Sequence, residues 1–272
     1  MFNLNELPFS DLLPSGVCDF SDLQNELINC RAITKIPEEA KSIIVFLFPY
    51  YLGEECYKNL NISKYAVPED YHKICGSYLE QIKAYLCKEY NEYKFEYFCD
   101  NSPINEVKAA SLAGLGIKGE NALLINKDYG SFCFIGEIIT DMHIACEKNE
   151  VESCLQCGLC SKKCPDSALN SSKVIKERCL SHITQKKGEL SEKEQTLILK
   201  NGCIWGCDIC QNVCPLNRNI KVSPIPEFYK NSKANYENSS DYSENRAYSW
   251  RKQDVIERNL EILCCKKDKN QL

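Results

Sequence analysis

The sequence lacks the features that would direct a chain into a membrane or out of the cell. No apolar run approaches the ~18 residues that a membrane-spanning helix needs. The longest such run, residues 43–48, has only the length of a strand. Residues 1–6 contain no basic segment followed by an apolar one, as a secretory signal would. We therefore expect a soluble, cytoplasmic protein without membrane contact.

Basic residues are not in excess either. The chain has 33 lysines and arginines against 38 aspartates and glutamates, a formal net charge of −5. This balance argues against a protein that binds nucleic acid over its whole surface. The sequence still allows a local basic patch, and the alternative is that the same residues form a solvated helix face. The residues concerned are Lys162, Lys163, Lys173, Lys176, Arg178, Lys186 and Lys187.

A complete nucleotide-binding motif is also missing. Residues 113–119 form a glycine-rich loop, AGLGIKG, that could cradle a phosphate through its backbone. The loop does not complete a G-x-G-x-x-G fingerprint, and no Walker lysine follows it. By itself, this loop is weak evidence for a phosphate site.

Cysteine, in contrast, is abundant, with 19 residues in a chain of 272. Residues 154–165 read C-x2-C-x2-C-x3-C-P, the bacterial ferredoxin pattern for a cubane iron–sulfur cluster. Residues 207–215 read C-x2-C-x3-C-P, which is the same pattern with one cysteine fewer. The other cysteines are scattered, which favours a reducing compartment where thiols serve as small apolar side chains.

The two runs predict two [4Fe–4S] clusters. In two-cluster ferredoxins the cysteine before proline ligates the other cluster. We therefore assign Cys154, Cys157, Cys160 and Cys214 to one cluster. Cys164, Cys207 and Cys210 belong to the second, and its fourth ligand is Cys179 or Cys203. A zinc ribbon and a disulfide framework are the alternatives, but paired runs that end in Cys-Pro favour iron–sulfur.

Periodicity predicts a mixed α+β protein. Residues 41–51 are continuously apolar and β-rich, as in a central strand that is covered on both faces. Residues 69–90 repeat apolar side chains at helical spacing, so this face is core rather than a cofactor box. Residues 95–99 form a short strand that ends at Asp100, and residues 104–112 form a helix that glycines break.

The remaining segments complete the expected organisation. We predict helix in the polar residues 1–40, a hairpin of strands 121–126 and 132–141, helices in 172–200 and 250–264, and a surface linker over 230–247. The domains are then an N-terminal α/β domain (1–150), a bacterial ferredoxin-like two-cluster module (151–222) and a C-terminal tail (223–272).

Several motifs follow one another in a fixed order between residues 41 and 220. They are ISKYAVPEDYH (62–72), DNSPINE (100–106), AGLG (113–116), GSFCFIGE (130–137), RCLS (178–181) and GCDICQNVCPLN (206–217). The cysteine runs alone would indicate only a ferredoxin-like module. The ordered set resembles the epoxyqueuosine reductase family, in a short form without the C-terminal helical-repeat domain.

The resemblance implies a cobalamin-dependent oxidoreductase with two [4Fe–4S] clusters. Such an enzyme removes the epoxide oxygen of epoxyqueuosine in tRNA to give queuosine, with electrons from a flavodoxin or ferredoxin. The resemblance also implies Cys179 as the missing cluster ligand and Asp100 as the proton donor. We predict Asp100, Leu124, Ile135 and Ser181 as cobalamin contacts, and a monomer.

Asp100 admits two interpretations. At a strand end over an apolar cofactor face its pKa should rise, which favours the protonated acid. The alternative is the N-cap of the helix that follows Pro103. A second feature, Asp141-Met-His143, nearly matches the D-x-H-x-x-G loop that supplies a lower cobalt ligand elsewhere, and we interpret His143 as a coincidence.

The chain departs from the family pattern at a few positions. Ala110, Ser111 and Leu112 stand where a tryptophan and an arginine are usual, and His182 replaces a tyrosine. Glu120 reverses the charge of the usual lysine, near where a tRNA or cofactor phosphate would lie. These differences bear on the substrate more than on the cofactors.

Two other functions therefore stay open. One is a paralogous cobalamin and iron–sulfur reductase that acts on a small molecule, as reductive dehalogenases do. The other is a two-cluster electron carrier without corrinoid. Salt-dependent binding of tRNA would separate the first of these from an epoxyqueuosine reductase.

Overall fold

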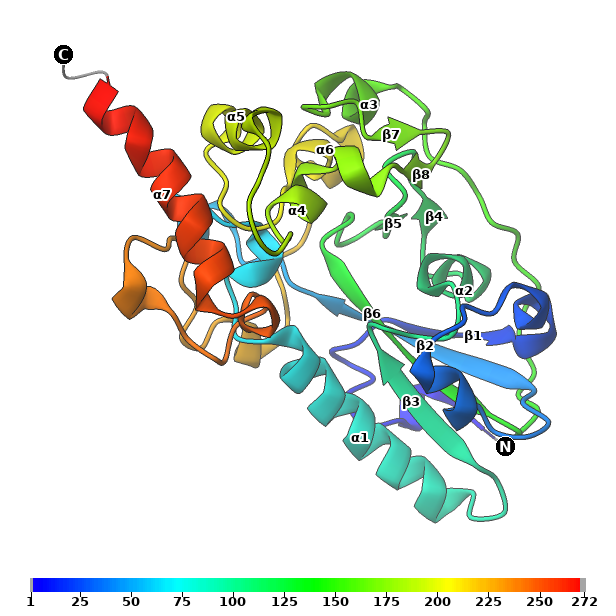
Figure 1. The fold of residues 1–272 in the computed structure, drawn as a ribbon. Helices are drawn as coiled ribbons and strands as arrows, with labels where there is room; N and C mark the ends of the chain where they lie inside the picture. Colours follow the sequence, from blue (N-terminus) through cyan, green and yellow to red (C-terminus); the bar gives the residue numbers. More distant parts are fainter. Residues whose placement is uncertain (1, 270–272) are drawn as a thin grey trace.

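The computed structural model describes residues 2–269, with the side chains of residues up to 264. Its centre is a four-stranded antiparallel sheet with the strand order β1-β2-β6-β3 (Figure 1). The strands are β1 (Ser15–Asp19), β2 (Ser42–Pro49), β3 (Phe95–Cys99) and β6 (Cys133–Thr140). The cysteine module lies at one end of the sheet and forms the upper part of Figure 1.

Strand β2 is the buried strand that the sequence predicts. Every one of its residues is buried. Ile44 and Phe46 pack with helix α1 (Tyr71–Glu89), whereas Ile43 and Val45 pack with helix α2 (Glu106–Leu112). Successive side chains of a strand point to opposite faces, so a strand covered by helices on both faces reads as one continuous apolar run.

The predictions for α1, β3 and α2 are confirmed, but that for the N-terminal segment is wrong. Residues 2–40 contain β1 and short 3-10 turns rather than an α-helix. Pro8, Pro14 and Pro37 interrupt the segment, and proline does not continue a helix. The turns are η1 (Leu4–Glu6), η2 (Phe20–Asp22), η3 (Gln24–Glu26) and η4 (Arg31–Lys35), followed later by η5 (Glu54–Tyr57) and η6 (Lys64–Ala66).

The predicted hairpin is also wrong. Strand β6 pairs with β2 on one side and β3 on the other, both far away in the sequence. From residues 121–126, only β5 (Leu124–Ile125) is a strand, and it pairs with β4 (Ile117–Lys118). Alternation identifies a strand but does not identify its partner, which tertiary packing selects.

Shorter elements than expected build the cysteine module. Residues 172–200 do not form one helix, because Ser172 has a positive φ of 58° and Gly188 one of 73°. A capping box between Ser191 and Glu194 starts α5. The elements are α3 (Leu159–Lys163), β7 (Leu169–Asn170), β8 (Lys173–Val174), η7 (Lys176–Arg178), α4 (Leu180–Ile183), α5 (Glu192–Asn201), α6 (Ile209–Asn212) and η8 (Pro215–Asn217).

The C-terminal segment packs into the same core as the sheet. Tyr236 is 1% exposed and belongs to the cluster that contains Phe46 and Trp205. Asn259 donates hydrogen bonds to the carbonyls of Thr184 and Ile204, which joins the last helix to the cysteine module. The elements are η9 (Pro226–Phe228), η10 (Ser239–Asp241), η11 (Ser249–Arg251) and α7 (Gln253–Lys269), and α7 confirms the predicted last helix.

Among residues 2–269, no helix combines the length and the apolar character that crossing a membrane requires.

Two glycines provide a matched test of the packing at β1. A Cβ on Gly16 would lie 2.2 Å from the carbonyl oxygen of Ala113, whereas a Cβ on Gly76 in α1 would meet nothing within 4 Å. We expect Gly16→Ala to destabilise the fold by about 1–3 kcal/mol, as overpacking does. Gly76→Ala should stabilise it by about 0.5–1 kcal/mol because alanine favours helix. Thermal unfolding of both variants measures the difference, and equal midpoints would contradict the close packing.

Candidate active site

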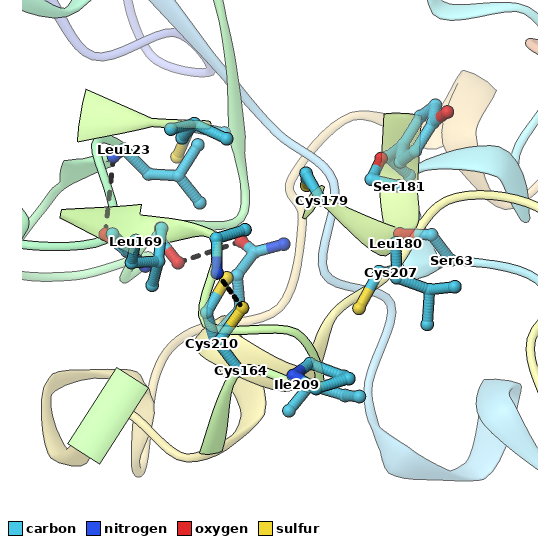
Figure 2. Close-up of a pocket in the computed structure, with 18 of the residues that line it drawn as sticks. Ser63, Leu123, Cys164, Leu169, Cys179, Leu180, Ser181, Cys207, Ile209 and Cys210 are labelled. Atoms are coloured by element: carbon cyan, nitrogen blue, oxygen red, sulfur yellow. Dashed lines mark hydrogen bonds between the residues drawn. The ribbon is translucent and has the colours of Figure 1, made fainter. Parts of the chain in front are cut away.

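A cavity of about 550 Å³ lies between the sheet and the cysteine module. Asp100 lines it from the end of β3. Cys164, Cys179, Cys207 and Cys210 line it from the module (Figure 2). Much of the remaining wall is apolar or aromatic: Tyr65, Tyr71, Leu123, Phe134, Ala168, Leu169, Val174, Leu180 and Ile209. An apolar cavity with a few convergent polar groups is the usual form of a cofactor site.

Five cysteines among the described residues line this cavity: Cys133 belongs to β6, and the other four come from three segments of the cysteine module. The module cysteines influence one another's pKa. Burial, and then the charges of neighbours that include Asp208, Cys179 and Cys164, raise the pKa of Cys207 to about 12. The backbone N–H of Ala168 donates to the sulfur of Cys164 at 3.2 Å. These four module thiols line one cavity, and four thiolates are the number of ligands that a [4Fe–4S] cluster requires. We call them the inner set.

The structure separates the two candidates for the fourth inner ligand. Cys179 lines the cavity. The thiol of Cys203 instead donates to the carbonyls of Trp205 at 3.3 Å and Gly206 at 3.2 Å. Its thiol is thus engaged with its own loop, which supports Cys179 as the ligand.

The outer set consists of Cys154, Cys157, Cys160 and Cys214, near the contact between α3 and α6. Burial raises the pKa of Cys214, and the nearby thiols of Cys154 and Cys157 raise it further. Cys157 is exposed and Cys160 is buried. Among the described residues that line the cavity, the outer set contributes none. The residues fit a second [4Fe–4S] cluster that faces the surface rather than the cavity.

Asp100 is held by three donors. Its Oδ2 accepts from the hydroxyl of Tyr71 at 2.7 Å and lies 3.2 Å from Nε2 of His72. Its Oδ1 accepts from the backbone N–H of Asn101 at 2.8 Å. Asp100 and Asn101 have φ of 56° and 47°, a region that costs energy for residues other than glycine and that clusters at functional sites.

Two expectations for Asp100 need correction. The hydrogen bond from His72, aided by those from Tyr71 and Asn101, outweighs burial and holds the pKa of Asp100 far below its ordinary value. The expected rise of this pKa is therefore wrong, because donors to a carboxylate stabilise its charged form. The N-cap alternative is also wrong, since the side chain that caps α2 is Asn105, which accepts from Lys108 N–H at 3.1 Å.

His72 and Tyr71 are site residues that the sequence argument missed. Nδ1 of His72 lies 2.7 Å from Oδ1 of Asp70. Burial alone would lower the pKa of His72, but the carboxylates of Asp100 and Asp70 raise it to about 10. His72 is therefore an imidazolium at neutral pH. The sequence did contain a signal for these two residues. They end the motif ISKYAVPEDYH (62–72), which was part of the family resemblance but to whose residues no role was assigned.

A pair of buried carboxyl groups lies behind Asp100. Glu137 on β6 is fully buried, and neither of its oxygens has a hydrogen-bond partner among the described residues. Burial raises its pKa well above the ordinary value, and Glu106 raises it further. Burial, and then the charge of Asp100, raise the pKa of Glu106 to about 8. Burial thus favours the neutral acid form of both groups.

The other predicted contacts divide between two cavities. Ser181 lines the main cavity. Leu124 and Ile135 line a neighbouring cavity of about 210 Å³, which shares Asp100 with the main one. His143 lies in a third cavity, beside Cys18 and Asp19, which accords with its interpretation as a coincidence.

Comparisons with known proteins agree on one family. Residues 153–217 match the model "4Fe-4S double cluster binding domain", and residues 31–101 match "Epoxyqueuosine reductase QueG, DUF1730". An epoxyqueuosine reductase of Cyclobacterium marinum is 36% identical over 189 residues, 68% of this chain and 61% of that protein. One of Cellulophaga algicola is 31% identical over 216 residues, 75% of this chain and 69% of that protein.

A solved structure shows the same fold. It is an epoxyqueuosine reductase with a tRNA-Tyr epoxyqueuosine-modified tRNA stem loop, with a TM-score of 0.72 and 25% identity. The match covers 83% of this chain and 64% of that one. This chain thus spans only part of the relatives that it matches, 61% in the case of the Cyclobacterium protein.

Proposed function

Because the chain belongs to the epoxyqueuosine reductase family, we propose that it reduces the epoxide of epoxyqueuosine in tRNA and leaves the cyclopentene of queuosine. The observation that carries the proposal is the main cavity, which has Asp100 on one wall and the four inner cysteines on the other. A group that occupies the cavity would lie between a source of electrons and a route for protons.

The cofactors in this proposal are two [4Fe–4S] clusters and cobalamin. The outer and inner sets hold one cluster each, with Cys179 as the fourth inner ligand. Asp100, Ser181, Leu124 and Ile135 are the proposed cobalamin contacts, and the apolar cavity wall suits the face of a corrin ring. When bound, cobalamin would supply a strongly reducing cobalt centre, and the clusters would supply low-potential electrons.

The protein's own task in this reaction is the supply of protons. Removal of an epoxide oxygen breaks two C–O bonds, forms one C=C bond and releases water, which consumes two electrons and two protons. Asp100 is the group that delivers a proton into the cavity. Because the carboxylate is ionised at rest, we infer that His72 recharges it through the 3.2 Å contact between Nε2 and Oδ2. Asp70 holds the ring of His72 in this orientation.

The substrate tRNA and the electron donor are further parts of the proposal. Leu169 and Val174 line the cavity on either side of the turn between β7 and β8. Four exposed lysines (Lys162, Lys163, Lys173 and Lys176) surround this turn in the sequence and could bind phosphates near the mouth of the cavity.

A flavodoxin or ferredoxin would reduce the exposed outer cluster. We propose a monomer in the cytoplasm, where tRNA is modified and thiols stay reduced.

An anaerobic titration tests the proposal. The chain, with its clusters reconstituted, is titrated with cobalamin and followed by visible spectroscopy, and is then mixed with epoxyqueuosine tRNA and a low-potential reductant. We expect a shifted Co(II) spectrum and conversion of the modified base, with tRNA binding that weakens as salt rises. Cobalamin binding without conversion would favour a reductase of another substrate. Clusters without cobalamin binding would favour an electron carrier.

A further inference from the structure

Glu120 lies against the outer cysteine set. Its Oε2 is 3.9 Å from the sulfur of Cys160, and its Oε1 is 3.4 Å from the hydroxyl of Ser161. Its backbone N–H donates to the sulfur of Cys154 at 3.3 Å. The residue thus reaches the outer set from a turn that lies 34 residues before Cys154 in the sequence.

The turn that carries Glu120 is firmly placed. The N–H of Gly119 donates to the carbonyl of Leu123, and the N–H of Ala122 donates to the carbonyl of Gly119. Asn121 is 4% exposed. The strand β4 before this turn also pairs with the outer set directly, because Cys154 N–H donates to Lys118 O at 3.0 Å. The position of the Glu120 carboxylate relative to the sulfurs is therefore a property of the fold.

The charge of Glu120 acts on the outer thiols. One of its carboxylate oxygens lies 3.9 Å from the sulfur of Cys160, so the charge acts on a proposed cluster ligand at close range. Among the ion pairs of the described residues, which are N···O contacts within 4.0 Å, none includes Glu120. A charge this close to a partly buried group is screened less than a charge in open solvent.

We propose that Glu120 lowers the reduction potential of the [4Fe–4S] cluster held by Cys154, Cys157, Cys160 and Cys214. A cluster gains a negative charge when it is reduced, and a neighbouring carboxylate makes that gain less favourable. The hydrogen bond from the backbone of Glu120 to Cys154 acts in the opposite direction, but a full charge outweighs one N–H dipole. An outer cluster of lower potential passes its electron inward more readily, toward the inner set and the cavity.

The inference rests on the proposed clusters and is independent of cobalamin and tRNA. The experiment is an anaerobic redox titration of the reconstituted protein, followed by electron paramagnetic resonance, for the wild type, Glu120→Gln and Glu120→Lys. We expect Glu120→Gln to favour reduction of one cluster by about tenfold, which is about 59 mV for a one-electron couple. Glu120→Lys should shift the same cluster further, and the other cluster should move little.

The control is Glu150→Gln, which removes the same charge from an exposed residue four positions before Cys154. An equal shift in this variant, an equal shift of both clusters in Glu120→Gln, or no shift at all would overturn the proposal. If Glu120→Gln fails to assemble its clusters, Glu120→Asp keeps the charge and draws it back by one methylene, so a smaller shift of the same sign is required. A wild-type protein that assembles no clusters would instead count against the proposed function.

Discussion

Asp100→Asn is expected to lower the rate of epoxide reduction by at least about 100-fold, within the range usual for the loss of a positioned proton donor. Asparagine has nearly the same shape as aspartate and can still accept hydrogen bonds from Tyr71 and His72, but it cannot carry a proton between His72 and the cavity. The measurement is single-turnover conversion of epoxyqueuosine tRNA by protein saturated with cobalamin.

The controls separate proton delivery from assembly. The spectra of both clusters should change little in Asp100→Asn, because Asp100 belongs to neither cysteine set. The affinity for cobalamin is measured alongside, since Asp100 is also a proposed cobalamin contact and the rate is compared only at saturation. Tyr71→Phe removes one hydrogen bond to Asp100 without removing the carboxylate, so a smaller loss is expected. A rate for Asp100→Asn within tenfold of the wild type would remove Asp100 from the proposed mechanism.

The behaviour of Asp100 illustrates the limit of the sequence argument. The strand β3 and the residue at its end were predictable, because a short apolar run and a turn are local signals. The placement of Asp100 at a cofactor cavity was expected only from the family resemblance. The direction of its pKa shift was not predictable, because the dominant donor, His72, lies 28 residues earlier in the chain. The three-dimensional position of a partner decides such a shift, and a single sequence does not contain it.

The same distinction applies to the fold and to the cysteines. The spacing of the two runs predicts which thiols share a cluster, because in two-cluster ferredoxins the cysteine before proline ligates the other cluster. The four thiols assigned to the inner set line one cavity in the structure. The pairing of β6 with β2 and β3 followed no local rule and was missed. Glu120 was noticed as a charge reversal, but its contact with Cys160 depends on how the turn before β5 packs.

The buried carboxyl pair predicts that stability falls as the pH rises. The pKa of Glu106 rises from an ordinary value of 4.5 to about 8 in the fold, and that of Glu137 rises well above 4.5. Below about 4.5, both groups are protonated in the folded and the unfolded chain. Above it, the unfolded chain loses these protons while the fold keeps them, which costs up to about 1.4 kcal/mol per pH unit for each group. The loss of stability that Glu106 causes ends near pH 8, where the group also loses its proton in the folded protein.

Glu137→Leu should weaken this pH dependence and stabilise the protein at pH 8. The expected gain is about 1–3 kcal/mol or more, since leucine removes a buried carboxyl that lacks a partner among the described residues. Thermal unfolding between pH 5 and pH 8 measures the slope, with the exposed Glu150→Gln as the control. Asp100, Glu106, Cys99 and Cys18 also face Glu137 and influence its titration. An unchanged slope would show that Glu137 is ionised in the fold.

The turnover of Glu137→Leu then tests whether the destabilising pair of Glu106 and Glu137 is needed for the reaction. Unsatisfied buried carboxyl groups are rare in native proteins and call for a reason. Glu106 lines a cavity together with Asp100, so a neutral carboxyl pair there can influence the charge of Asp100 and hold a proton close to it. A variant that gains stability and loses turnover would show that the pair is retained for the reaction. A variant that gains stability at full turnover would leave His72 as the sufficient source of protons for Asp100.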